Sequence, residues 1–178
     1  MMSPPADGLD PTREALKAID RAMTGDSDVL EVGCGTGVMA ERISALSGVT
    51  LVVIDHSDAS VELAEARGID ARWADICYLP FEDDTFDVVY AGAMLHEVRD
   101  IERAVAEVRR VLRPGGTFVA VTDVDDGSAN EGRGKGARRA NPRFSSENGE
   151  GKLARRFSDV RRHDLESGDS SVTVFEAR

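Results

Sequence analysis

The nine residues Val29–Gly37, VLEVGCGTG, constrain the fold of this chain more than any other segment. The short, mostly apolar run Val29–Val32 predicts a buried strand, and three glycines follow it within five positions. Glycine adopts positive φ without strain, so Gly33–Gly37 predicts a tight turn whose backbone can approach a ligand closely. Apolar residues then recur at helical spacing from Val38 to Leu46. A strand, a glycine turn and a helix in this order predict a site for a nucleotide-like ligand at the helix N-terminus.

Strand and helix patterns alternate through the rest of the chain. A first helix is expected from Pro11, capped by Asp10, to the stop at Gly25. Beyond the glycine turn we expect strands at 50–54, 69–74, 86–91 and 117–122, and helices at 58–67 and 101–112. Residues 145–178 are expected to form a weak helix within 145–157 and a hairpin of strands 159–165 and 171–176. This order predicts an α/β protein with a parallel sheet and right-handed crossovers.

The composition of the 178-residue chain indicates one domain with an acidic surface. Its formal net charge of −11 disfavours nucleic acid and anionic membranes as partners. No apolar run is long enough to span a membrane and no secretory signal is recognised, so we expect a cytoplasmic protein. The two cysteines and three histidines predict neither a disulfide framework nor a metal site. The excess of acidic residues leads to the hypothesis that the protein is adapted to high salt.

Two aspartates that end expected strands are candidate ligand-binding residues. Asp55 lies 18 residues after Gly37 and is placed to accept hydrogen bonds from ribose hydroxyls, with a helix cap as its alternative role. Asp75 could accept from the exocyclic amine of an adenine while Ile76 lies against the ring, with turn stabilisation as its alternative role. Trp73 is expected in a wall of the site or in the core. The G-x-G-x-G spacing differs from the dinucleotide fingerprint and lacks the lysine of a P-loop.

Four segments together resemble the class I S-adenosylmethionine-dependent methyltransferases, in particular the small-molecule, methyltransferase type 11-like group related to quinone-biosynthesis methyltransferases. They are VLEVGCGTG (29–37), VVIDHS (52–57), ADICYLPFEDDTFDVVYAGAMLHEVRD (74–100) and RVLRPGG (110–116). The resemblance covers residues 28–123 well and 145–178 loosely. It implies a Rossmann-like sheet of seven mostly parallel strands, with the last strand antiparallel and helices on both faces.

This family implies that residues 1–178 form a single domain with four parts. These are an N-terminal helix (1–27), a cofactor-binding core (28–123), a Gly/Arg-rich loop or lid (124–144), and a helix with the terminal strand pair (145–178).

The resemblance also implies S-adenosylmethionine as the cofactor. The glycine turn and the acid before it would hold the methionine half and the ribose, and the end of the second strand would hold the ribose hydroxyls and flank the adenine. The end of the third strand would hold the adenine edge, and the end of the fourth would face the amino-acid end. The residues so assigned are Glu31, Gly33, Cys34, Gly35, Gly37, Asp55, His56, Asp75, Ile76, Ala91 and Gly92.

The activity implied is transfer of a methyl group to an unidentified small molecule by in-line displacement. His96 is the candidate general base, with a local structural role as its alternative. The segment 131–143 carries five bases against one acid, so Arg138 and Arg139 are candidates for binding an anionic substrate, and a solvated loop is the alternative. Two other functions are a non-catalytic module that binds the cofactor or assists another enzyme, and a nucleotide-dependent oxidoreductase.

Overall fold

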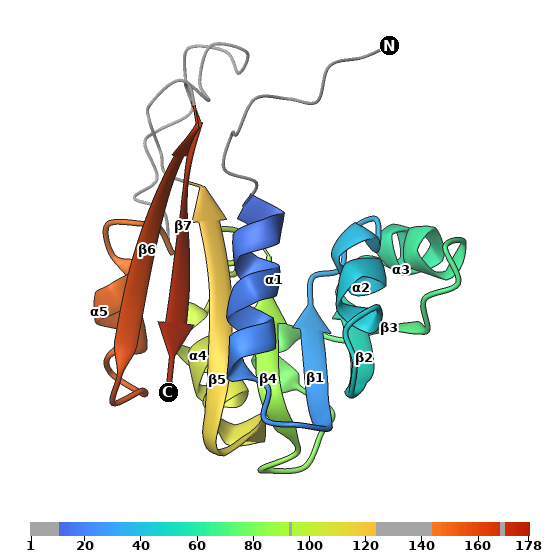
Figure 1. Cartoon of the computed structure of the whole chain (residues 1–178), viewed down its shortest axis with the longest axis horizontal. Coiled ribbons are helices and arrows are strands. Elements are labelled where there is room, and N and C mark those ends of the chain that lie inside the picture. The colour runs from blue at the N-terminus through green and yellow to red at the C-terminus, as the bar shows by residue number, and fades with distance from the viewer. Residues whose placement is uncertain (1–10, 93, 124–143, 168–169) are drawn as a thin grey trace.

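Seven strands form one mixed sheet in the order β3-β2-β1-β4-β5-β7-β6 (Figure 1). The computed structural model describes residues 11–92, 94–123, 144–167 and 170–178. Strands β1 to β5 pair in parallel, whereas β7 pairs antiparallel with both β5 and β6. The expected Rossmann-like sheet with an antiparallel last strand is therefore confirmed. The strands are β1 (Ser27–Val32), β2 (Val49–Asp55), β3 (Ala71–Trp73), β4 (Phe86–Ala91), β5 (Leu112–Asp123), β6 (Val160–Ser167) and β7 (Ser170–Ala177).

The strand order reverses beside β1, and this reversal positions the site. The chain first builds outward from β1 to β2 and β3, then returns to place β4 on the other side of β1. In open α/β sheets, ligands bind outside the carboxyl ends of the strands at such a reversal. The register places Glu31 of β1 between Val53 of β2 and Tyr90 of β4, so the three residues lie level with one another near those ends.

Helices α1 (Pro11–Ala22), α2 (Val38–Ser44) and α3 (Asp58–Glu65) cover one face of the sheet (Figure 1). The spacing of Ala15, Ala18 and Ile19 puts them on one side of α1, where all three are buried against β4, β5 and β7. Ala64 of α3 packs with Val53 of β2. Because the side chains in this cluster are small or β-branched, α2 and α3 lie close over β2 and β3.

Helices α4 (Ile101–Val111) and α5 (Gly149–Leu153), with the 3₁₀ helix η1 (Ile76–Tyr78), cover the opposite face. The helix expected at 101–112 is confirmed, and its Ile101, Val105 and Val108 are all buried in the larger core. Aromatic rings fill the end beneath α5, where Phe118 stacks on Phe157 and Phe144 meets Phe175 edge to face. The fold therefore has the expected three layers of helix, sheet and helix.

Some boundaries differ from the expected ones. Strand β5 begins at Leu112 and not at Thr117, directly after α4 ends at Val111. The Arg113 guanidinium donates to Asp28 and Asp87, which ties this segment to β1 and β4, and the β4–β5 register shifts between Phe86 and Val88. Helix α5 spans only five residues and β3 only three.

Several expectations fall outside the described residues. They are the Asp10 cap, the basic segment 131–143 and, within it, Arg138 and Arg139. Among the helices of the described ranges, none combines the length and apolar character needed to cross a membrane.

Candidate functional site

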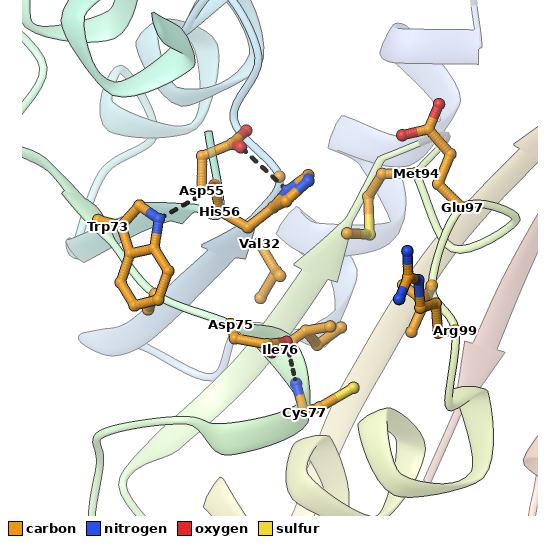
Figure 2. Close-up of a pocket in the computed structure, with 13 residues that line it drawn as sticks. Val32, Asp55, His56, Trp73, Asp75, Ile76, Cys77, Met94, Glu97 and Arg99 are labelled. Carbon is orange, nitrogen blue, oxygen red and sulfur yellow. Dashed lines mark hydrogen bonds and ion pairs between the residues drawn. The ribbon is translucent and has the colours of Figure 1, made fainter. Parts of the chain in front are cut away.

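A cavity of about 420 Å³ opens where β1, β2 and β3 end (Figure 2). This volume lies in the usual range for a small-molecule site. One wall comes from β2, β3 and η1, and the facing wall comes from the turn between β4 and α4. The lining residues are Val32, Gly33, Asp55, His56, Trp73, Ala74, Asp75, Ile76, Cys77, Met94, Glu97, Val98 and Arg99.

The glycine turn has the backbone conformation that the sequence predicted. Gly33, Gly35 and Gly37 have φ values of 78°, 52° and 78°, which a residue with a Cβ adopts only under strain. A Cβ on Gly33 would lie 2.7 Å from Cγ of Met94, and one on Gly37 would lie 3.1 Å from Cα of Ala64. A Cβ on Gly35 would meet nothing within 4 Å. Gly33 and Gly37 are thus required by close packing, whereas Gly35 leaves open space.

Asp55 joins the glycine turn to the end of β2. Its Oδ2 accepts a hydrogen bond from the Gly35 N–H at 3.0 Å, and its Oδ1 accepts from the Ser57 N–H at 2.9 Å. His56 Nδ1 lies 3.4 Å from Oδ1. The carboxylate is buried yet lines the cavity. It therefore shapes the turn and still presents acceptor lone pairs to a ligand.

Glu31 lies buried on β1, with 1% of its surface exposed. Its Oε2 is the one buried side-chain nitrogen or oxygen atom, among the residues described, that lacks a hydrogen-bond partner. Burial, and then the charge of Asp55, raise the pKa of Glu31 to about 8. Burial and Glu31 also raise the pKa of Tyr90, its neighbour on β4. A buried acceptor without a donor is costly, so this carboxyl is suited to a ligand group that donates or carries positive charge.

Cys34 is a space-filling residue in the turn. Its side chain packs with Ala40, Val53 and Ala64, and burial, followed by Asp55 and Glu31, raises the pKa of the thiol to about 11. The thiol is therefore not a nucleophile near neutral pH. Any contact of this residue with a ligand in the cavity would come from its backbone.

Asp75 belongs to the cavity wall that β2, β3 and η1 form. Its Oδ1 accepts from the Cys77 N–H at 2.8 Å and caps η1, while buried Ile76 lines the cavity. One carboxylate oxygen of Asp75 therefore stabilises the turn, which was the alternative role expected for this residue. Trp73 forms the outer part of this wall and is 59% exposed, so it does not lie in the core. The Trp73 indole N–H donates to the His56 carbonyl at 2.8 Å, which fixes the ring beside the cavity.

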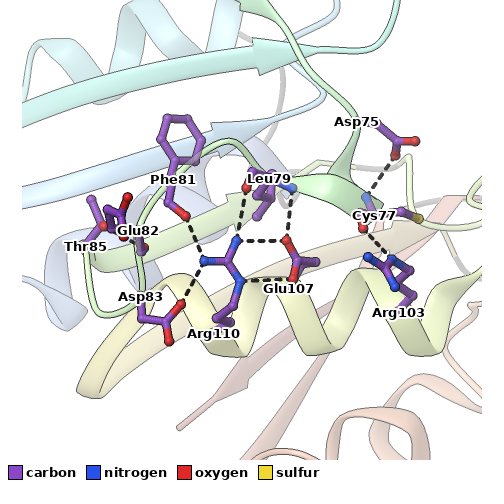
Figure 3. Close-up of polar contacts among 10 residues, drawn as sticks. All are labelled: Asp75, Cys77, Leu79, Phe81, Glu82, Asp83, Thr85, Arg103, Glu107 and Arg110. Carbon is purple, nitrogen blue, oxygen red and sulfur yellow. Dashed lines mark hydrogen bonds and ion pairs between the residues drawn. The ribbon is translucent and has the colours of Figure 1, made fainter.

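Helix α4 holds this wall in place through Arg110 (Figure 3). The guanidinium donates to the carbonyls of Leu79 and Phe81 and to the carboxylates of Asp83 and Glu107. Glu107 in turn accepts from the Leu79 N–H at 3.0 Å, and its bond with Arg110 lowers its pKa. These bonds attach the segment after η1 to the helix, so the position of the wall depends on α4.

The facing wall is the turn after β4. Gly92 follows the buried Ala91, and its carbonyl accepts from the Met94 N–H at 2.6 Å. The Met94 side chain lies over Gly33, and Glu97 and Arg99 line the cavity beyond it. His96 is exposed and is not among the lining residues; its Nε2 lies 3.6 Å from Oε1 of Glu97.

The predicted residues form one neighbourhood, but they do not all line the cavity. Of the eleven assigned to the cofactor, those that line it are Gly33, Asp55, His56, Asp75 and Ile76. Glu31, Cys34, Gly35, Gly37, Ala91 and Gly92 lie beneath or beside it. The sequence analysis missed Met94, Val98 and Arg99. Their segment directly follows an expected strand end, and that position was the signal that could have identified them.

The donor and acceptor groups fit a nucleoside with a cationic tail. Asp55 and Asp75 present carboxylate oxygens for hydroxyls and an amine, and Glu31 offers an unsatisfied acceptor beneath the glycine turn. No group of three or more His, Cys, Asp or Glu side chains in the described ranges is arranged to hold a metal ion. The chemistry of this set therefore suits S-adenosylmethionine.

Comparisons with known proteins agree with this assignment. The family model described as "Methyltransferase domain" matches residues 30–120. The chain is 37% identical over 100 residues to the sterol 24-C-methyltransferase erg6 of Schizosaccharomyces pombe, covering 52% of this chain and 26% of that protein. It is 34% identical over 92 residues to the mitochondrial arginine-hydroxylase NDUFAF5 of Danio rerio, covering 51% and 29%.

A solved structure of a SAM-dependent methyltransferase from Aquifex aeolicus aligns with a TM-score of 0.68. The alignment covers 94% of this chain and 93% of that one at 20% identity, so it supports the fold. The match spans only about a quarter to a third of the length of the two curated relatives. Their similarity therefore concerns the shared domain.

Proposed function

We propose that this chain, which belongs to the methyltransferase domain family, transfers a methyl group from S-adenosylmethionine to a small molecule. The observation that carries the proposal is the cavity at the ends of β1, β2 and β3, which two carboxylates line and beside which lie the positive-φ glycine turn and an unsatisfied buried acid. When bound, S-adenosylmethionine would supply an electrophilic methyl group, which an acceptor takes by in-line attack while S-adenosylhomocysteine leaves as a neutral thioether.

The residues of this chain would act mainly by positioning. Asp55 and Asp75 would accept hydrogen bonds from a nucleoside, and Trp73, Ile76 and Met94 would exclude water from it. Displacement from a good leaving group depends chiefly on alignment, which contributes several kcal/mol, about 7–11 in well-oriented intramolecular reactions. A fixed glycine turn and a wall anchored to α4 supply that alignment.

His96 is proposed as the general base for acceptors that must lose a proton. It is exposed beside the cavity, and Glu97 lies 3.6 Å from its Nε2. We expect His96→Gln to lower kcat with such an acceptor and to leave the Kd for S-adenosylmethionine unchanged. An unchanged kcat with the true acceptor would remove His96 from the mechanism.

The first test is calorimetric titration of the purified chain with S-adenosylmethionine. Asp55→Asn keeps one carbonyl acceptor but removes the charge, and we expect it to weaken binding at least tenfold. Asp70→Asn is the matched control, because Asp70 is exposed and pairs with Arg72 outside the cavity. Thermal unfolding of each variant separates weaker binding from loss of fold.

The second test adds a panel of small-molecule acceptors and follows formation of S-adenosylhomocysteine. Binding with turnover supports the proposal. Binding without turnover on any acceptor would favour the alternative, a non-catalytic module that binds the cofactor or assists another enzyme. A folded chain that does not bind S-adenosylmethionine would overturn both.

We also propose a cytoplasmic setting and a small-molecule substrate, without nucleic acid or membrane as partners. Both cysteines are buried free thiols, which is typical of a reducing compartment. The net charge of −11 opposes binding to polyanions and supports the hypothesis of adaptation to high salt.

A further inference from the structure

Arg99 is an exposed arginine in the cavity wall that has no partner among the residues described. In the described part of the chain it makes no hydrogen bond, ion pair or ring contact, although its side chain lines the cavity. The acids nearest to it in sequence have other partners: Glu97 lies beside His96, and Asp100 accepts from the Arg103 N–H. Nearby arginines differ, since Arg103 and Arg110 are both bonded to main-chain carbonyls.

The cavity therefore has two walls of different charge. Asp55 and Asp75 present carboxylates from the β2 and β3 side, while the guanidinium of Arg99 lies on the opposite side near Met94 (Figure 2). Met94 and Val98 line the same cavity, and Arg99 itself is exposed. An anionic ligand in the cavity would therefore meet a guanidinium that no described acid already pairs with.

We propose that Arg99 binds a carboxylate group of a ligand in this cavity, an inference that rests on the proposed function. The planar guanidinium matches a carboxylate with two parallel N–H···O bonds. A phosphate dianion fits less well, because Asp55, Asp75 and Glu97 lie in the same cavity and repel the additional charge. The carboxylate has two possible sources, the amino-acid end of S-adenosylmethionine and the methyl acceptor.

The first arm of the test measures the Kd of S-adenosylmethionine and of its decarboxylated analogue by calorimetry. The variants are Arg99→Gln and Arg99→Lys, and Arg156→Gln is the control because Arg156 is exposed and does not line the cavity. If the source is the cofactor, Arg99→Gln weakens S-adenosylmethionine at least tenfold and leaves the decarboxylated analogue unchanged. Arg99→Lys restores part of the affinity.

The second arm measures saturation-transfer NMR signals of benzoate and neutral benzamide, with and without S-adenosylhomocysteine. If the source is the acceptor, benzoate gives the stronger signal and loses that advantage in Arg99→Gln but not in Arg156→Gln. The proposal is overturned if Arg99→Gln changes neither arm. Wild-type protein that binds no S-adenosylmethionine refutes the proposed function, and the benzoate arm without nucleoside then still tests Arg99 alone.

Discussion

At the residue scale, the buried Glu31 makes stability depend on pH. Its raised pKa, from 4.5 to about 8, means that the folded chain holds a proton that the unfolded chain releases. Protonation of Glu31 therefore contributes to the free energy of unfolding. The contribution is full below pH 4.5 and is lost as the pH rises towards 8, and its size is on the order of a few kcal/mol.

We therefore expect Glu31→Gln to flatten the fall in unfolding free energy between pH 5.5 and 8. Urea unfolding of both proteins at several pH values measures it. The same variant should bind S-adenosylmethionine more weakly, since it removes an acceptor that can ionise. Parallel pH profiles for the two proteins would contradict this role of Glu31.

The glycine turn offers a second comparison between single residues. Gly35→Ala adds a Cβ at positive φ but in open space, so we expect a stability loss of about 1 kcal/mol and at least tenfold weaker cofactor binding. Gly37→Ala also presses on the backbone of α3 at Ala64 and should cost more stability. Chemical unfolding and calorimetry measure the two effects. Equal stability losses would show that the packing against α3 does not matter.

Five residues assigned to the cofactor, chosen for their place at or just after strand ends, line the cavity, and their binding roles stay predictions. Asp55 and Asp75 could be identified because a short apolar strand precedes each of them. The raised pKa of Glu31 could not be predicted from the sequence. It depends on burial between β2 and β4, which are distant in sequence. Arg99 escaped notice for a similar reason, since only the folded turn brings it opposite Asp55 and Asp75.

At the scale of elements, α4 and the segment after η1 depend on Arg110. We expect Arg110→Ala to lower the unfolding free energy by about 2–4 kcal/mol, because two carbonyls lose their side-chain donor and Glu107 keeps only the bond from the Leu79 N–H. Arg155→Ala, which breaks an exposed pair with Glu102, should change it by less than about 1 kcal/mol. Urea unfolding compares them, and similar losses would refute a special role for Arg110.

Element boundaries were less predictable than element types. The expected start of the fifth strand at Thr117 was wrong, because β5 already begins at Leu112, although the proline and glycines in between are typical of a turn. The ion pairs of Arg113 with Asp28 and Asp87 hold this bulged segment against β1 and β4. These contacts join residues from three strands, so local sequence patterns do not report them.

At the scale of the whole molecule, the net charge of −11 predicts a dependence on salt. Self-repulsion among surface acids weakens as the Debye length shortens from about 10 Å at 0.1 M to 3 Å at 1 M. We expect Tm to rise steadily from 0.1 to 2 M KCl. Circular dichroism melts measure it, and a constant Tm would contradict the hypothesis of salt adaptation.

The class of the fold, a mostly parallel sheet with helices on both faces, was the most predictable property of the molecule. When apolar strands are joined by short connections, few arrangements of the strands in a sheet are possible. Right-handed crossovers then place helices on both faces of that sheet. The resemblance added the antiparallel β7, which the alternation of local patterns alone does not specify. The role of the basic residues Arg138 and Arg139 stays a prediction, because they lie outside the described residues.

The tryptophan beside the cavity has a practical consequence. Trp73 is the one tryptophan of the chain, and its half-exposed indole is fixed by the bond to His56. Excitation at the red edge of protein absorbance therefore reports from this wall alone. A nucleoside entering the cavity would quench or shift the emission, and Trp73→Phe would abolish the signal. The molecule thus carries its own fluorescent probe of occupancy, which can follow ligand entry on the millisecond scale without a label.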